Sequence, residues 1–205
     1  MTRLGQIVIL NGAPRSGKSS IAVAIRERFD GVWLNLGVDA YAAMTPKRFQ
    51  PGIGLRPGGE RPDLEAVIPQ LYAALYDSIA AHSRHGLNVV VDVGHHDSYS
   101  TRLNILPDCA RQLAGLPVLF VGVRCPLEII MQRRNHGGGQ YVKGSPEDPM
   151  PEPARRWQEA VHAHGIYDLE VDTGKLTPEE CADIIAQQLT QRASGPSAFQ
   201  RLALR

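Results

Sequence analysis

The sequence is poor in cysteine and has no long apolar run. Its three cysteines, Cys109, Cys125 and Cys181, are far apart and form no CxxC pair, so neither a disulfide framework nor a structural zinc site is expected. No apolar run approaches the roughly 18–20 residues that span a bilayer. The N-terminal apolar stretch is short, which favours a strand over a signal peptide. These absences predict reduced thiols, a cytoplasmic location and no membrane partner.

The sequence also lacks an excess of charge of either sign. It has 22 Lys and Arg against 21 Asp and Glu, a formal net charge of +1. This balance gives no basic field for nucleic acid, so nucleic-acid binding is not expected. A length of 205 residues with 43% hydrophobic residues fits one globular domain. A homo-oligomer is compatible with this composition but is not indicated by it.

Apolar runs alternate with helical patterns along the chain. This order predicts an α/β fold, a parallel sheet with helices on both faces. The expected strands are Gln6–Leu10, Val32–Leu36, Leu87–Val93, Val118–Val123 and Tyr167–Val171, and the expected helices lie in 18–29, 64–79, 100–114, 126–134, 153–162 and 177–191. We expect one domain over 1–192 and a flexible tail over 193–205.

Two long segments, 45–61 and 135–153, are rich in Pro and Gly and have no packing pattern. Loops of this length are usually functional or disordered. The second begins beside Arg133, and we expect a lid around 133–153.

One motif carries most of the functional signal. Residues 12–19 match GxxxxGK[ST] between a buried strand and an amphipathic helix, the context that a phosphate-binding loop requires. Backbone N–H groups of such a loop converge on phosphate oxygens, the lysine neutralises the β- and γ-phosphates, and the serine ligates Mg²⁺. The predicted ATP and Mg²⁺ site consists of Gly12, Ala13, Pro14, Arg15, Ser16, Gly17, Lys18, Ser19 and the adjacent Ser20, with Ser19 as metal ligand.

Two carboxylates follow strands that should end beside this loop. Asp39 can accept the proton of an acceptor hydroxyl, but Asp also caps helices well, and a short helix is expected to follow it. Asp92 ends a valine-rich strand and can hold Mg²⁺ or shape the acceptor site. The alternative for Asp92 is a capping carboxylate at a strand end.

Five separated blocks, ILNGAPRSGKS, LGVDAY, VVVD, VGVRCPLEI and HGIYDLEVDTG, resemble the chloramphenicol phosphotransferase-like proteins, which are small P-loop kinases. The resemblance runs from about residue 6 to 190. It implies the P-loop NTPase fold, a five-stranded parallel sheet of order 2-3-1-4-5 and Asp39 as the catalytic base. It also implies that Arg133 belongs to an arginine-bearing lid and that Asp172 and Thr173 lie beside adenine. A solvated helix end is the alternative for Arg133 and Arg134, and a structural role is the alternative for Asp172.

The chain departs from the lid pattern of this family after Arg134. Gly137, Gly138 and Gly139 stand where further arginines are expected, so His136 or Lys143 would have to supply lid charge.

Several acceptors are compatible with the sequence. We expect a small hydroxylated molecule to contact Asp39, Tyr41, Asp92 and His95, although aromatic residues such as Tyr41 mostly fill cores. Chloramphenicol, and with it antibiotic resistance, is one candidate. Shikimate- or gluconate-like metabolites and nucleotide-sugars, as in zeta-type toxins, are others. A nucleotide-binding regulator without turnover is the alternative from a different class.

Overall fold

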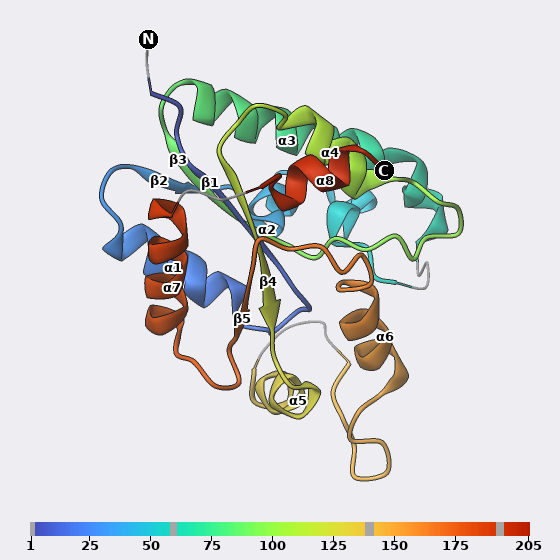
Figure 1. Cartoon of the computed structure of the whole chain (residues 1–205). Coiled ribbons are helices and arrows are strands. Elements are labelled where there is room, and N and C mark those ends of the chain that lie inside the picture. The colour runs from blue at the N-terminus through green and yellow to red at the C-terminus, as the bar shows by residue number, and fades with distance from the viewer. Residues whose placement is uncertain (1–2, 58–60, 138–141, 192–194) are drawn as a thin grey trace.

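A computed structural model describes residues 3–57, 61–137, 142–191 and 195–205. Its centre is a five-stranded sheet of order β2-β3-β1-β4-β5 (Figure 1). The paired strands run parallel to one another, which confirms the predicted sheet and its order. The strands are β1 (Ile7–Asn11), β2 (Trp33–Asn35), β3 (Asn88–Val93), β4 (Val118–Arg124) and β5 (Leu169–Asp172).

The central strand β1 is buried along its whole length. In register, Ile9 lies opposite Val91 of β3 on one side and Phe120 of β4 on the other. A strand covered on both faces must be apolar throughout rather than alternating. This requirement explains the continuous apolar runs from which the strands were predicted.

Helices cover both faces of the sheet (Figure 1). The helices α1 (Lys18–Arg28) and α7 (Pro178–Thr190) pack against one face, where their apolar residues meet those of β1, β3 and β4. On the other face α3 (Ile68–Arg84) buries Tyr72, Tyr76 and Ile79 against the sheet, and α4 (Ile105–Gln112) packs beside α3. Helix α2 (Val38–Ala43) follows β2 in the chain, and α5 (Leu127–His136) follows β4. Helix α6 (Glu152–Ala160) lies between α5 and β5 in the chain. Helix α7 begins at a capping box, in which Glu180 N donates to Thr177 Oγ1 and Thr177 N donates to Glu180 Oε2.

The prediction of a flexible tail over 193–205 is wrong where the structure describes the end of the chain. Helix α8 (Ala198–Ala203) begins at a second capping box, formed by Ser197 and Gln200. Phe199 is 3% exposed and packs edge-to-face on Phe120 of β4. Burial of this ring and of Leu202 supplies the apolar contact that the short pattern did not reveal.

The segment 45–61 is more structured than a plain loop. It contains the short 3-10 turns η1 (Lys47–Phe49) and η2 (Gly52–Gly54), and η3 (Pro62–Val67) leads into α3. The Arg61 guanidinium donates to the carbonyls of Arg48 and Gln50, which holds the segment closed on itself. Part of this segment and part of the predicted lid, including Gly138 and Gly139, lie outside the described residues.

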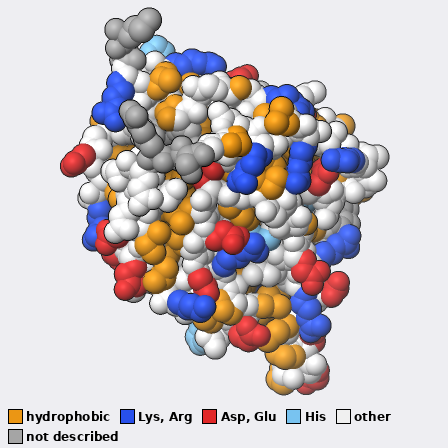
Figure 2. Space-filling model, in the orientation of Figure 1, with side chains coloured by type: hydrophobic (Ala, Val, Ile, Leu, Met, Phe, Trp, Pro, Cys, Tyr) orange, Lys and Arg blue, Asp and Glu red, His pale blue; other side chains and the backbone are white. Residues whose placement is uncertain are grey.

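Acidic and basic side chains alternate over the face shown in Figure 2 without a large field of one sign, as the net charge predicts. Within the described ranges, no helix is both long and apolar enough to cross a membrane.

Candidate active site

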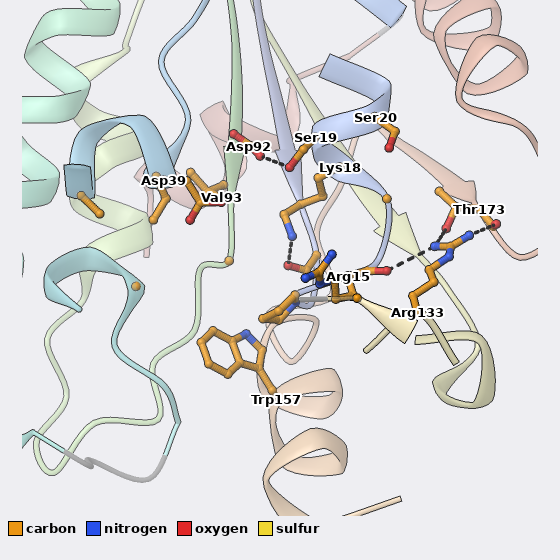
Figure 3. Close-up of a pocket in the computed structure, with 18 of the residues that line it drawn as sticks. Arg15, Lys18, Ser19, Ser20, Asp39, Asp92, Val93, Arg133, Trp157 and Thr173 are labelled. Atoms are coloured by element: carbon orange, nitrogen blue, oxygen red, sulfur yellow. Dashed lines mark hydrogen bonds between the residues drawn. The ribbon is translucent and has the colours of Figure 1, made fainter. Parts of the chain in front are cut away.

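A cavity of about 1070 Å³ lies at the carboxyl ends of β1 and β3, where ligands bind in open α/β sheets. Its walls are the loop before α1, helix α2, the 50–56 segment, the end of β3, the end of α5, Trp157 of α6 and residues after β5. Figure 3 shows Asp39 on one side of Lys18 and Ser19, with Arg133 and Thr173 on the other. The cavity therefore joins segments that are more than a hundred residues apart in the sequence.

The loop before α1 has the backbone that its glycines predict. Gly17, with φ of 96°, is the left-handed residue that turns the chain into α1, a conformation that glycine adopts without steric cost. Lys18 is the first residue of that helix, and its Nζ donates to the carbonyls of Gly12 and Ala13 at 2.8 and 2.9 Å. The lysine thus folds back over the loop and places its ammonium in the cavity.

Burial lowers the pKa of Lys18 from 10.5 to about 8, although the nearby carboxylates of Asp92 and Asp39 favour its charged form. A partly desolvated ammonium interacts more strongly with an anion than one in water does. Phosphate groups that reach the loop would therefore meet a cation whose charge is poorly solvated. This arrangement suits a polyphosphate ligand.

Ser19 and Asp92 form a close pair at the floor of the cavity. The Ser19 hydroxyl donates to Asp92 Oδ2 at 2.8 Å (Figure 3), and Asp92 is 8% exposed. On its other side the carboxylate lies against the backbone of Gly37, where a Cβ would stand 1.6 Å from Oδ1. Hydroxyl and carboxylate oxygens are ligands that Mg²⁺ prefers, usually together with waters and substrate phosphates. The pair fits such an ion.

Asp39 lines the cavity from α2. It is not the helix cap, because Gly37 holds that position and no side chain caps the helix. Asp39 lies instead in the exposed first turn, where the helix dipole favours a carboxylate. The capping alternative is therefore excluded, and the carboxylate is available to a ligand.

Tyr41 lies away from this cavity. Two residues beyond Asp39 on the same helix, it lines a separate apolar groove of about 370 Å³ with Met44 and Phe49. Residues two apart face different sides of a helix. The structure thus does not bring Tyr41 into contact with the cavity, contrary to the prediction.

Arg133 ties the P-loop to the segment after β5. Its Nη1 donates to the carbonyl of Arg15 and to Thr173 Oγ1, and its Nη2 to the carbonyl of Thr173 at 2.9 Å. Thr173 Oγ1 donates in turn to the carbonyl of Ser16 at 2.6 Å. Arg133 and Thr173 both line the cavity. The solvated-end alternative does not describe Arg133, whose guanidinium is bonded on several sides.

The neighbours of these two residues differ from expectation. Asp172 does not line the cavity; its Oδ1 accepts from Gly174 N, which stabilises the turn after β5. Arg134 is 5% exposed, so it is not the solvated helix end considered above. His136 lines the cavity, whereas Lys143 is exposed and away from it.

His95 is a core residue, and its predicted contact with an acceptor is wrong. It is 1% exposed, its ring stacks on Tyr72, and Nε2 shares a hydrogen bond with Tyr76 OH at 2.6 Å. Burial lowers its pKa from 6.5 to about 3. His96 turns to the opposite side, and its Nε2 lies 2.9 Å from the carbonyl of Leu55. Adjacent residues in extended backbone point in opposite directions.

A buried polar network supports the P-loop from below. Asn11, the last residue of β1, donates to the carbonyl of Val161 and to Tyr167 OH, and its Oδ1 accepts from the backbone of His95. Tyr167 OH also lies 2.7 Å from Nδ1 of His162, whose pKa burial lowers to about 3. His162 is therefore part of the support for the loop.

Sequence reasoning missed several residues that line the cavity. Arg56 and Gln50 belong to the 45–61 segment, whose length and Pro and Gly content predicted only that it is functional or disordered. Trp157 is only 7% exposed, yet it lines the cavity. Leu176 and Pro178 add an apolar surface beside Thr173. None of these positions belongs to a motif whose spacing could have indicated its role.

Comparisons with known proteins agree with this geometry. A model of the family described as chloramphenicol phosphotransferase-like protein matches residues 5–190. A provisionally named O-phosphotransferase of Mycobacterium tuberculosis is 27% identical over 98% of this chain and 89% of its own length. Three solved structures share the fold. A Janibacter sugar kinase is 18% identical with a TM-score of 0.61, and the match covers 90% of this chain and 94% of that one. The Deinococcus radiodurans tunicamycin resistance protein is 20% identical with a TM-score of 0.58, and the match covers 94% of this chain and 99% of that one. A shikimate kinase from Acinetobacter baumannii is 13% identical with a TM-score of 0.56, and the match covers 90% of this chain and 93% of that one.

Proposed function

The chain belongs to the chloramphenicol phosphotransferase-like family of small P-loop kinases, and from this premise we infer that it transfers the γ-phosphoryl group of ATP to a hydroxyl of a small molecule. One observation carries the inference. Asp39, the Ser19–Asp92 pair and Lys18 line the same cavity, so a base, a metal-ligand pair and a phosphate-binding cation face one space.

The nucleotide is proposed to bind across the P-loop. Backbone N–H groups of residues 12–19 and the start of α1 suit the phosphates, and Lys18 adds its charge. Thr173 lines the cavity on the side away from Asp39. The apolar Leu176 and Pro178, which follow it closely in the chain, also line the cavity, which suits a flat base. Arg133 holds the two halves of this site together through the P-loop carbonyl of Arg15.

Ser19 and Asp92 are proposed to hold Mg²⁺, the first directly and the second directly or through water. A divalent ion there supplies positive charge to the phosphate oxygens during transfer. Arg133 sits at the nucleotide side and supports transfer by fixing the loop.

Asp39 is proposed to act on the acceptor. Its carboxylate accepts the proton of the acceptor hydroxyl as the oxygen attacks the γ-phosphorus. A new bond forms between that oxygen and phosphorus, the bond from phosphorus to the β–γ bridging oxygen breaks, and ADP leaves with the bond's electron pair. In-line transfer of this kind depends on positioning and charge more than on covalent chemistry by the protein.

The acceptor's identity is proposed only as a class, a hydroxylated small molecule. Chloramphenicol would make the reaction an antibiotic-resistance activity. The names of structural neighbours point to other acceptors, since they include a sugar kinase and a shikimate kinase. A regulator that binds ATP without turnover is the rival outcome.

Replacing Asp39 by Asn tests the proposal, together with an ATP-consumption screen of the wild-type protein against alcohols that include chloramphenicol, sugars and shikimate. Asn keeps the size of the side chain and removes the base, so transfer should fall by about 10²–10⁴-fold with little change in ATP affinity. Asp30→Asn, at an exposed position away from the cavity, is the matched control.

Three results would contradict parts of this mechanism. ATP binding by the wild-type protein without transfer to any alcohol would favour the regulator. An unchanged rate in Asp39→Asn would remove the general base. Loss of ATP binding together with Mg²⁺ dependence would assign Asp39 to the metal.

A further inference from the structure

The acceptor side of the cavity has a continuous wall that the proposed mechanism does not use. Gly54 of η2 approaches Val38 of α2, since a Cβ on Gly54 would lie 4.0 Å from its side chain. The next residue, Leu55, is buried, and its carbonyl is held by His96 at 2.9 Å. The His96 ring then packs edge-on against Trp157, with centroids 6.1 Å apart. The wall thus runs from beside Asp39 to α6.

Trp157 carries an unused hydrogen-bond donor at this wall. The residue is 7% exposed and lines the cavity, and its Nε1 has no hydrogen-bond partner among the described residues. Gly94 lies next to it, where a Cβ would stand 3.6 Å from Nε1. A buried donor without a partner destabilises the folded protein. Such a cost is tolerated at a site where a ligand accepts the bond.

Arg56 adds a positive charge to the same wall. It directly follows Leu55, whose carbonyl is fixed by His96, and it is half-buried and lines the cavity. The apolar side chains of Val38, Ala42 and Ile53 line the cavity as well. The acceptor side therefore has a carboxylate on α2, a cation directly after Leu55, and apolar side chains.

Resting on the proposed function, we propose that the acceptor is a hydroxylated anion, a small hydroxy acid or phosphate ester. Its anionic group is bound by Arg56, one of its oxygens accepts from Trp157 Nε1, and its hydroxyl faces Asp39. The opposite charges of Arg56 and Asp39 orient the bound acceptor, because its anionic end is attracted to Arg56 and repelled by Asp39. A neutral acceptor gains no such attraction.

Trp157 itself supplies the readout. The chain has two tryptophans, and Trp33 packs on Phe29 away from the cavity, so Trp33→Phe leaves Trp157 as the sole reporter. The Trp33→Phe variant, saturated with ADP and Mg²⁺, is titrated with two sets of probes. The first set is glycerate, glycerol 3-phosphate and glycerol, and the second is gluconate and sorbitol. Within each set the probes differ mainly in whether they carry an anionic group, and the first set also separates a carboxylate from a phosphate.

We expect saturable fluorescence changes with the carboxylate or the phosphate ester, and binding at least tenfold weaker for glycerol and sorbitol. Arg56→Gln should weaken anion binding at least tenfold. Arg48→Gln is the matched control, an exposed arginine of the same segment that does not line the cavity, and it should leave binding unchanged. Trp157→Phe, which keeps an aromatic ring but loses the N–H, should raise the KM of the anionic acceptor about tenfold at unchanged nucleotide affinity.

The inference is overturned if neutral and anionic probes bind equally, if no anionic probe binds, or if Arg56→Gln and Arg48→Gln behave alike. A different result would show that the proposed function is wrong. That result is the absence of phosphoryl transfer to any alcohol, measured by ADP release in the wild-type protein.

Discussion

The carboxylate of Asp92 occupies the space that a side chain on Gly37 would need: a Cβ built on Gly37 would stand 1.6 Å from Asp92 Oδ1. The other carboxylate oxygen of Asp92 accepts from Ser19. The turn that begins α2 is therefore packed directly against the proposed metal-ligand pair. Asp39, the proposed base, lies two residues beyond this contact at the start of α2. A displacement at Gly37 would therefore reach both the proposed acceptor side and the proposed metal side of the site.

This contact makes Gly37→Ala informative. The added methyl group would push Asp92 away from Ser19 or displace the start of α2. We expect transfer to fall at least tenfold, with a higher Mg²⁺ concentration needed for half-maximal rate. The measurement is the Mg²⁺ dependence of ADP formation. Gly195→Ala, where a Cβ meets nothing within 4 Å, is the control, and equal Mg²⁺ dependence in both variants would contradict the prediction.

The lowered pKa of Lys18 predicts a pH dependence of nucleotide binding. Below about pH 8 the lysine is charged in the free protein. Above it, phosphates must bind together with a proton, because their charge raises the lysine pKa. Affinity for a non-hydrolysable ATP analogue should therefore fall by up to about tenfold per pH unit above pH 8. Calorimetry at pH 9 in buffers of different ionisation enthalpy should show uptake of nearly one proton.

The sign is reversed for folding. The unfolded chain holds its proton up to about the ordinary value of 10.5, so Lys18 makes the free energy of unfolding rise with pH between about 8 and 10.5. Lys18→Met should remove both effects, along with most nucleotide affinity and transfer. Proton uptake at pH 9 that persists in Lys18→Met would assign the effect to another group.

Arg133→Lys separates position from charge. Lysine keeps the positive charge but cannot bridge the carbonyls of Arg15 and Thr173 as the guanidinium does. If Arg133 acts by joining these segments, Arg133→Lys and Arg133→Ala should both lower ATP affinity by about tenfold or more. Gln132→Ala, an exposed neighbour on α5, should have no effect. Near-normal kinetics in Arg133→Lys alone would show that charge is what matters.

Phe199→Ala tests the role of α8. The ring packs between Phe120 and Tyr76, so its loss should lower the free energy of unfolding by about 3–5 kcal/mol. No residue of α8 lines the cavity, and neither Phe120 nor Tyr76 does. ATP affinity at a temperature well below the melting point should therefore be unchanged. Denaturant unfolding compares this variant with Leu204→Ala, which removes an 89% exposed side chain and should be nearly neutral.

The fold was largely predictable from local patterns, and its five-strand order came from the resemblance. Strands buried on both faces must be apolar, as β1 and β3 are, and the P-loop motif sets a strand, a turn and a helix in sequence. The tail was mispredicted because Ala198, Phe199 and Leu202 are too few to show a period. Their burial depends on the surface that α4 and β4 offer them.

By itself the sequence determined the phosphate-binding loop, because its chemistry depends on backbone conformation over eight consecutive residues, and it identified Asp39 and Asp92 as carboxylates at strand ends. Only the tertiary structure decided which side chains share the cavity. His95 and Tyr41 lie near Asp92 and Asp39 in sequence but point into the core and into another groove. Arg56 and Trp157 are distant in sequence, yet both line the cavity, and His96 contacts Trp157 and the carbonyl next to Arg56. Local patterns fix which way a chain turns, but the direction of a side chain depends on contacts between segments distant in sequence.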